Sequence, residues 1–282
     1  MTPGELYRYD LKGFLYVENA IEPGLLKRLS ERMDVWQEKG RQLLETCAKA
    51  TSPPKVGWNT RVGWDPAISA IRPLVDFYDI VNQDESGAFG DLVVNPRILP
   101  YIDEMVQNPR LKSTWIAFKW RGGMTVGHSN HTPTNTCNFY HFSGGRIYHN
   151  LFNLIYAISD VKLGGGGLKL IPGSHKANYP LPPEKDREDL LAEMTMKAGS
   201  VLMFSHDAYH TSLNTTDEVR RVILYTYCPG VIANAWNESG DTMHDRLFDE
   251  APEGSWRKYL LRRPNGASES YPKPQGRPYD AG

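Results

Sequence analysis

The stretch GSVLMFSHDAYHTSLNTTDEVRRVILYTYCP, residues 199–229, has two apolar runs on either side of a polar segment. The first run, GSVLMFS, and the last, RRVILYTYCP, are rich in β-branched and aromatic residues, which is typical of strands. The polar segment between them carries His206, Asp207 and His210. A connection between two strands of a barrel lies at its mouth, where side chains from neighbouring strands can converge on a ligand. We therefore expect a binding site at this connection.

The rest of the chain divides into a helical part followed by a part rich in strand-like runs. A long helix is predicted for 22–47, where apolar residues recur with helical spacing after Pro23, and a shorter helix for 96–108. Connections rich in Gly and Pro fill much of 48–95. Further strand-like runs are 13–20, 113–120, 150–161 and 166–172. Helices followed by strands without alternation predict an antiparallel sandwich or barrel.

The predicted organisation is a single domain over residues 1–282, with an all-β core and flanking helices. A helical and irregular region, 1–112, is expected to pack on a barrel formed by 113–230. The segment 231–282 is rich in Pro, Gly and Arg and is expected to be an irregular tail.

Composition narrows the class of partner. The chain has 32 basic and 33 acidic residues, a net charge of −1, so no electrostatic footprint for nucleic acid or anionic lipid is visible and a small-molecule substrate is favoured. No targeting segment and no run of about 20 apolar residues is present, which predicts a cytoplasmic protein without a membrane partner. Cys47, Cys137 and Cys228 lie far apart, which indicates neither a disulfide framework nor a thiolate zinc site. Nothing in the sequence indicates the oligomeric state.

Three stretches resemble the phytanoyl-CoA dioxygenase (PhyH-like) family of Fe(II)/2-oxoglutarate oxygenases. They are the opening helix and strand at 7–29, YAISDVKLGGGGLKLIPGSHKANYP at 156–180, and AGSVLMFSHDAYHTSLNTTDEVRR at 198–221. The resemblance implies a double-stranded β-helix, which is a jelly roll of the cupin type. It also implies Fe(II) and 2-oxoglutarate as cofactors and O2 as a reactant.

Residue by residue, the resemblance assigns the distal half of the site. His210 matches the distal iron ligand, and Ser212 matches a hydroxyl that contacts the 2-oxoglutarate carboxylate. Arg220 matches the arginine that binds the C5 carboxylate, with Arg221 as the alternative. Because side chains alternate along a strand, the two arginines point to opposite faces and only one can serve.

The proximal half departs from the family pattern, because the usual H-x-D is missing. We expect His128 to be the proximal ligand, since it follows the strand 113–120 and lies 82 positions before His210 (210 − 128), a separation of the kind that the resembled family shows. His141 and His149 would leave little chain for the connecting loop and strand.

The sequence pattern leaves the identity of the third iron ligand undecided. Asn130 takes the place of the usual aspartate, and an amide is a poorer ligand for Fe(II) than a carboxylate. Asp207, three residues before His210, is predicted to supply the missing carboxylate, which gives the triad His128, Asp207 and His210. The alternatives are Asn130 or a water in the third position, or an all-histidine set that uses His131.

The function implied is oxidation of an unactivated C–H bond of a small molecule, by default hydroxylation, while 2-oxoglutarate and O2 become succinate and CO2. The missing carboxylate leaves room for a halide, so halogenation is an alternative. An iron oxidase indifferent to Arg220, another cupin-type metalloenzyme such as an isomerase, and a non-catalytic cupin-like binding protein are the remaining alternatives.

Overall fold

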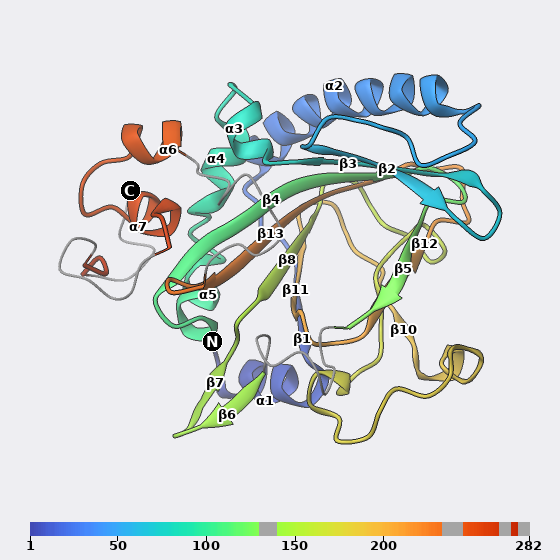
Figure 1. The fold of residues 1–282 in the computed structure, drawn as a ribbon. Helices are drawn as coiled ribbons and strands as arrows, with labels where there is room; N and C mark the ends of the chain where they lie inside the picture. Colours follow the sequence, from blue (N-terminus) through green and yellow to red (C-terminus); the bar gives the residue numbers. More distant parts are fainter. Residues whose placement is uncertain (130–139, 233–244, 265–271, 276–282) are drawn as a thin grey trace.

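Two antiparallel β-sheets form the centre of the molecule (Figure 1). The computed structural model describes residues 1–129, 140–232, 245–264 and 272–275. The larger sheet has the order β1 (Phe14–Val17), β11 (Val201–Ser205), β8 (Phe152–Ala157), β13 (Arg220–Pro229), β4 (Pro109–Lys119), β3 (Ala70–Tyr78), β2 (Thr60–Asp65). The smaller has the order β10 (Ala192–Glu193), β9 (Lys169–Leu170), β12 (His210–Leu213), β5 (Met124–His128). A separate hairpin pairs β6 (His141–Ser143) with β7 (Arg146–Tyr148).

The larger sheet buries both of its faces, and side-chain alternation assigns each residue to one of them. On β13, Ile223 and Tyr225 belong to the cluster that packs against the helices. Val222 and Leu224 on the same strand pack in a second cluster, together with Leu170 of the smaller sheet. One face of the larger sheet therefore meets helices, and the other faces the smaller sheet.

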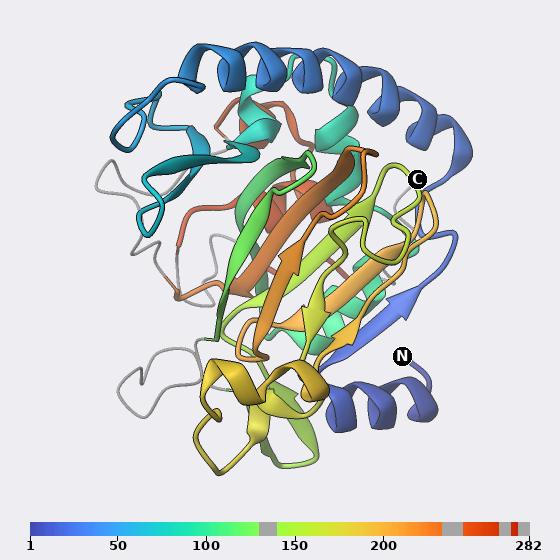
Figure 2. The same cartoon turned by 90° about the vertical axis from the view of Figure 1, so that its right-hand side faces the viewer.

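Helix α2 (Pro23–Cys47) supplies the longest cover of the helical face and runs along the top of Figures 1 and 2. Pro23 occupies its first turn, and the Glu22 carboxylate accepts a hydrogen bond of 3.0 Å from the Leu25 N–H, which satisfies one of the free donors at the helix start. Leu29, Met33 and Trp36 recur at helical spacing and are buried. The long helix predicted for 22–47 is confirmed.

Shorter helices complete the cover. They are α3 (Ile80–Gln83), α4 (Ala88–Val93), α5 (Leu99–Met105), α6 (Asp245–Glu250) and α7 (Trp256–Leu261), while α1 (Pro3–Lys12) lies at the opposite end of the molecule from α2 (Figures 1 and 2). In the described part of the chain, 3-10 turns are formed by Ser174–Lys176, Glu184–Asp186 and Glu188–Leu190. No helix among the described residues is long and apolar enough to cross a membrane.

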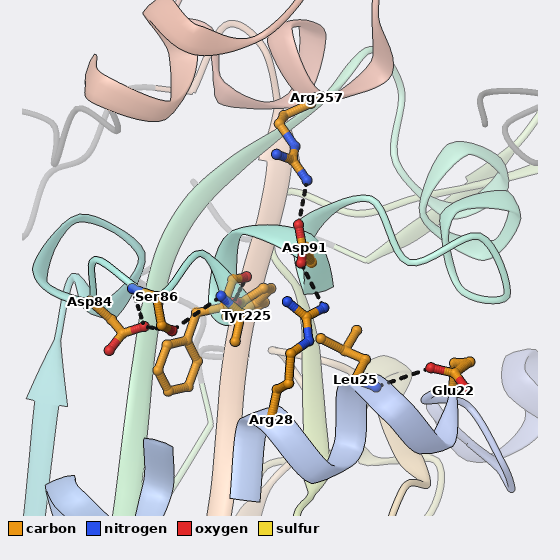
Figure 3. Close-up of polar contacts among 10 residues, drawn as sticks. Glu22, Leu25, Arg28, Asp84, Ser86, Asp91, Tyr225 and Arg257 are labelled. Carbon is orange, nitrogen blue, oxygen red and sulfur yellow. Dashed lines mark hydrogen bonds and ion pairs between the residues drawn. The ribbon is translucent and has the colours of Figure 1, made fainter. Parts of the chain in front are cut away.

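Asp91 of α4 joins two helices that are far apart in the sequence (Figure 3). Its Oδ2 atom is 2.8 Å from Arg28 of α2, and its Oδ1 atom is 2.9 Å from Arg257 of α7. These groups are partly exposed, so each pair contributes about 1 kcal/mol or less to stability. They connect α4 to α2 and to α7.

Two regions differ from the expectation of irregular structure. Residues 60–78, expected to be connections, form β2 and β3 in the larger sheet. Pro73 made a strand hard to predict here, because proline cannot donate a hydrogen bond to a neighbouring strand. The proline is tolerated because it lies where the register with β2 shifts, between the pairs Val62–Val75 and Gly63–Arg72. The segment 231–282 likewise contains α6 and α7.

Candidate active site

A pocket lies between the two sheets and is lined by residues from both. It encloses about 690 Å³ of empty space, part of which is open to solvent. Its polar lining residues are Arg61, Asp76, Tyr78, Lys119, Thr125, His128, Asn153, His206, His210, Ser212 and Arg220. Its other lining residues are Trp115, Ala117, Ile155, Leu168, Phe204 and Leu224. The pocket therefore has apolar walls with a few convergent charged groups, which is typical of small-molecule sites.

His128 and His210 lie directly opposite each other on the neighbouring strands β5 and β12. Their ring centroids are 4.2 Å apart. At Gly127, next to His128, a Cβ atom would overlap the Tyr209 hydroxyl, so the glycine leaves room for that side chain. The structure thus brings together the two histidines that the sequence predicts as proximal and distal ligands.

Each of these histidines is oriented by a backbone carbonyl. The Nδ1 atoms of His128 and His210 lie 2.8 Å from the carbonyl oxygens of Val126 and Ala208. A carbonyl can only accept a hydrogen bond, so the proton resides on Nδ1 and the lone pair of Nε2 is available to a metal. Burial, with smaller effects from His128 and His206, holds the pKa of His210 well below its ordinary value, so this ring is neutral. The donor chemistry fits a divalent iron ion.

A third histidine, His206, also lines this end of the pocket. Its ring centroid lies 6.3 Å from that of His128 and 6.0 Å from that of His210. Its Nδ1 atom is 2.6 Å from the Nδ2 atom of Asn153, and burial lowers its pKa to about 3. No ligand role is predicted for His206 from the sequence, and the structure places it at the wall of the pocket.

The other end of the pocket is cationic. Lys119 of β4 and Arg220 of β13 are directly opposite each other across the larger sheet, and both are buried. Like charges in opposite positions on neighbouring strands repel each other, and burial increases the cost. Burial and the charge of Arg220 lower the pKa of Lys119, and burial lowers the pKa of Arg220 to about 10. A bound anion would relieve this repulsion.

Hydroxyl groups surround the lysine. The Lys119 Nζ atom donates to Thr125 Oγ1 at 2.6 Å and to Ser212 Oγ. Because Ser212 Oγ accepts from the lysine, its own hydrogen can be donated to an anion in the pocket. Among the described residues, no acceptor takes a hydrogen bond from the Arg220 guanidinium, which leaves its donors available.

The strands β2 and β3 add a further charged pair. Arg61 and Asp76 form an ion pair at the wall of the pocket. Among the described lining residues there are therefore three Arg and Lys cations, Arg61, Lys119 and Arg220, against the one carboxylate of Asp76. This excess of positive charge fits a dianion such as 2-oxoglutarate.

Arg221 lies on the opposite face from Arg220, as strand alternation predicts. It forms an ion pair of 2.7 Å with Asp34 of α2 and donates to the Ser30 carbonyl at 2.7 Å. Arg220 is the arginine of this pair that lines the pocket.

Asp207 is not among the side chains that line the pocket. Its Oδ2 atom accepts a hydrogen bond of 2.7 Å from the Tyr140 N–H, and its backbone carbonyl accepts one of 2.6 Å from Ser129. Among the described residues, no group of three His, Cys, Asp or Glu side chains is placed so that it could hold a metal ion. That Asp207 is a ligand therefore stays a prediction.

The remaining histidine candidates lie elsewhere. His141 is exposed and stacks on Tyr148, and His149 is buried against Tyr9. His175 is buried, with its Nε2 atom 3.1 Å from the Asp10 carbonyl, which agrees with a structural role. Asn130 and His131 lie outside the described residues.

Sequence reasoning missed Lys119 and Thr125 in addition to His206. Lys119 had a detectable signal: alternation along STWIAFKW places Trp115, Ala117 and Lys119 on one face, so a lysine shares the inner face of a buried strand. Arg61 and Asp76 had no such signal, because their strands were not predicted.

A jelly-roll pocket lined by two histidines and by a buried lysine and arginine fits the class of non-haem iron oxygenases that use 2-oxoglutarate. The chain belongs to the phytanoyl-CoA dioxygenase (PhyH) family, whose family model matches residues 9–222. The family resemblance of the sequence is thereby confirmed. No curated protein matches the sequence closely enough to count as a relative.

Solved structures share the fold. HygX from Streptomyces hygroscopicus, with nickel, 2-oxoglutarate and hygromycin B bound, is 20% identical over 81% of this chain and 88% of its own, with a TM-score of 0.59. The epimerase SnoN, in complex with Fe3+, alpha-ketoglutarate and nogalamycin RO, is 17% identical over 95% of this chain and 96% of its own, with a TM-score of 0.56. At this identity the likeness shows the fold, and the predicted jelly roll is confirmed. The cofactors predicted from the sequence, iron and 2-oxoglutarate, are those of this class.

Proposed function

We propose that the protein oxidises a small-molecule substrate at a C–H bond with Fe(II), 2-oxoglutarate and O2. The observation that carries the proposal is the pairing, in one pocket, of two oriented histidines with the opposed cations Lys119 and Arg220. A metal ion alone would need only the first pair. A keto acid bound to that metal needs both, because its far carboxylate must be neutralised.

At the histidine end, His128 and His210 would hold the iron through Nε2. Their backbone hydrogen bonds fix the tautomer and the ring direction. With 2-oxoglutarate and O2, the bound iron supplies the oxidising power that breaks an unactivated C–H bond, and 2-oxoglutarate becomes succinate and CO2. The apolar walls formed by Trp115, Phe204 and Leu224 limit the access of water.

At the cation end, Arg220 and Ser212 would bind the far carboxylate of 2-oxoglutarate. Arg220 offers a fork of donors that matches a carboxylate, and the Ser212 hydroxyl can donate its hydrogen because its oxygen already accepts from Lys119. Lys119 adds a second positive charge in a dry environment, where electrostatic attraction is strong.

The substrate is proposed to be a small molecule. HygX and SnoN are crystallised with hygromycin B and nogalamycin RO, respectively, which supports a small organic substrate for this chain as well. Hydroxylation is the expected outcome of the reaction. SnoN, an epimerase, shares the fold, so the outcome must be assigned from the products.

The test is an anaerobic titration of the purified protein with Fe(II) and then with 2-oxoglutarate, followed by the weak visible charge-transfer band of the chelate. Arg220→Ala should keep the affinity for iron and lower the affinity for 2-oxoglutarate by at least about 30-fold, because it removes the buried cation that would pair with the far carboxylate. Arg221→Ala is the matched control, since the neighbouring arginine points to α2. Iron binding without a band would contradict the use of 2-oxoglutarate, and no iron binding would leave a non-catalytic binding protein.

A further inference from the structure

The contacts of Asp207 connect the two halves of the histidine end. Its backbone carbonyl accepts from Ser129, the neighbour of His128, and its carboxylate accepts from the Tyr140 N–H. Its own N–H donates to Ser205 Oγ at 3.3 Å, at the end of β11. Asp207, which lies three positions before His210, therefore contacts Ser129 and Tyr140, the two described residues that flank 130–139.

These contacts are buried. Asp207 is 2% exposed, and within the described structure its Oδ1 atom has no hydrogen-bond partner. An unpaired buried carboxylate oxygen is unfavourable for folding. The other oxygen, Oδ2, accepts from the Tyr140 N–H at 2.7 Å and from the Ser205 hydroxyl at 3.5 Å, so the described contacts of this carboxylate are made through Oδ2.

Tyr140 extends the connection to the N-terminal helix. Its hydroxyl donates to the Asp10 carboxylate on α1, and Lys176 lies 2.8 Å from the other oxygen of Asp10. Tyr140 is thus held at two points, at its N–H by Asp207 and at its hydroxyl by Asp10 of α1. The turn before β12, which carries His206 and Asp207, is connected to Tyr140 through Asp207.

We propose that Asp207 is a positioning residue, which holds Ser129 and Tyr140 and so fixes His128 relative to His210, and that its carboxylate does not bind the metal. This inference rests on the proposed function, since it concerns the same site. It gives Asp207 a role different from the ligand role predicted from the sequence. Groups that orient metal ligands typically change metal affinity by about 10–100-fold when they are removed.

The discriminating pair of variants is Asp207→Asn and Asp207→Ala. Asparagine keeps an acceptor oxygen for the Tyr140 N–H but is a much poorer metal ligand than a carboxylate. Titration with Fe(II) alone, under anaerobic conditions, should show Asp207→Asn within about threefold of wild type and Asp207→Ala weaker by about 10–100-fold. Asp186→Asn, at an exposed 3-10 turn, is the matched control.

Hydrogen exchange at the Tyr140 amide gives a readout that needs no metal. Asp207→Ala should speed this exchange because the acceptor is lost, and Asp207→Asn should not.

Ser129→Ala removes the other contact without touching the carboxylate and should lower the affinity for Fe(II) by several-fold. The visible band with 2-oxoglutarate should keep its position in Asp207→Asn.

The proposal is overturned if Asp207→Asn loses Fe(II) as completely as Asp207→Ala, since the carboxylate would then be a ligand. It is also overturned if Asp207→Ala leaves both Fe(II) affinity and Tyr140 exchange unchanged. Failure of the proposed function looks different: the wild-type protein itself would bind no Fe(II), and the exchange at Tyr140 would still decide the role of Asp207.

Discussion

The two ends of the pocket are built in different ways. The cation end is set by regular strands: Lys119 and Arg220 are a register pair in the long β4–β13 ladder. The histidine end lies where short strands finish, with a register shift between His210 and Ser212 and with side-chain contacts to loops. Regular ladders fix charge positions through periodicity, whereas ligand positions at strand ends depend on contacts between segments far apart in the chain.

The largest expected effect is at the histidine end. His210→Ala should reduce Fe(II) affinity by more than about 100-fold, because it removes a ligand and not merely a group that orients one. Anaerobic Fe(II) titration measures it. Retained affinity would show that His210 is not a ligand and would remove the contrast between the two ends.

At the cation end, the sharpest change is Lys119→Met, for which binding and stability should move in opposite directions. Affinity for 2-oxoglutarate should fall by about 30-fold or more, while Fe(II) affinity stays. The free energy of unfolding without ligand should rise by about 1 kcal/mol, because the buried repulsion with Arg220 is removed.

Calorimetric binding and thermal unfolding measure the two effects, with the exposed Lys197→Met as the control. If Lys119→Met destabilised the unliganded protein, its contacts with Thr125 and Ser212 would outweigh the repulsion.

A smaller effect is expected for His206→Ala, about tenfold in Fe(II) affinity, since its ring lies farther from His128 and His210 than they lie from each other. Fe(II) titration alongside His210→Ala is the measurement. A loss equal to that of His210→Ala would identify His206 as the third ligand and would make this end an all-histidine site.

The smallest expected effect is a pH dependence of the affinity for 2-oxoglutarate, which should change by less than about tenfold per pH unit. Burial and Arg220 lower the pKa of Lys119, so its ammonium is complete only below that lowered pKa. A bound anion raises the pKa again, so 2-oxoglutarate binding takes up protons and weakens as the pH rises through the lowered value. Calorimetry in two buffers of different ionisation enthalpy detects the uptake, and Lys119→Met should abolish it.

The sequence predicted the cation end and the histidine end of the pocket to different extents. Alternation showed only that one of Arg220 and Arg221 can serve, and the family resemblance favoured Arg220. His128 was chosen over His141 and His149 by its separation from His210. Asp207 was predicted as a ligand because it is near His210 in sequence. Proximity in a turn does not fix the direction of a side chain, so its ligand role stays a prediction: Oδ2 accepts from the Tyr140 N–H, and Oδ1 has no partner among the described residues.

The sequence by itself determined the antiparallel β core, the long helix 22–47, the family and the two histidines, the serine and the arginine that line the pocket. These features are encoded by local periodicity and by short motifs. Only the tertiary structure decided that residues 60–78 join the sheet, that His206 and Lys119 line the pocket and that Asp207 contacts Ser129 and Tyr140. The physical reason is that these placements arise from pairing and burial between distant segments, which compete with local preference and usually prevail over it.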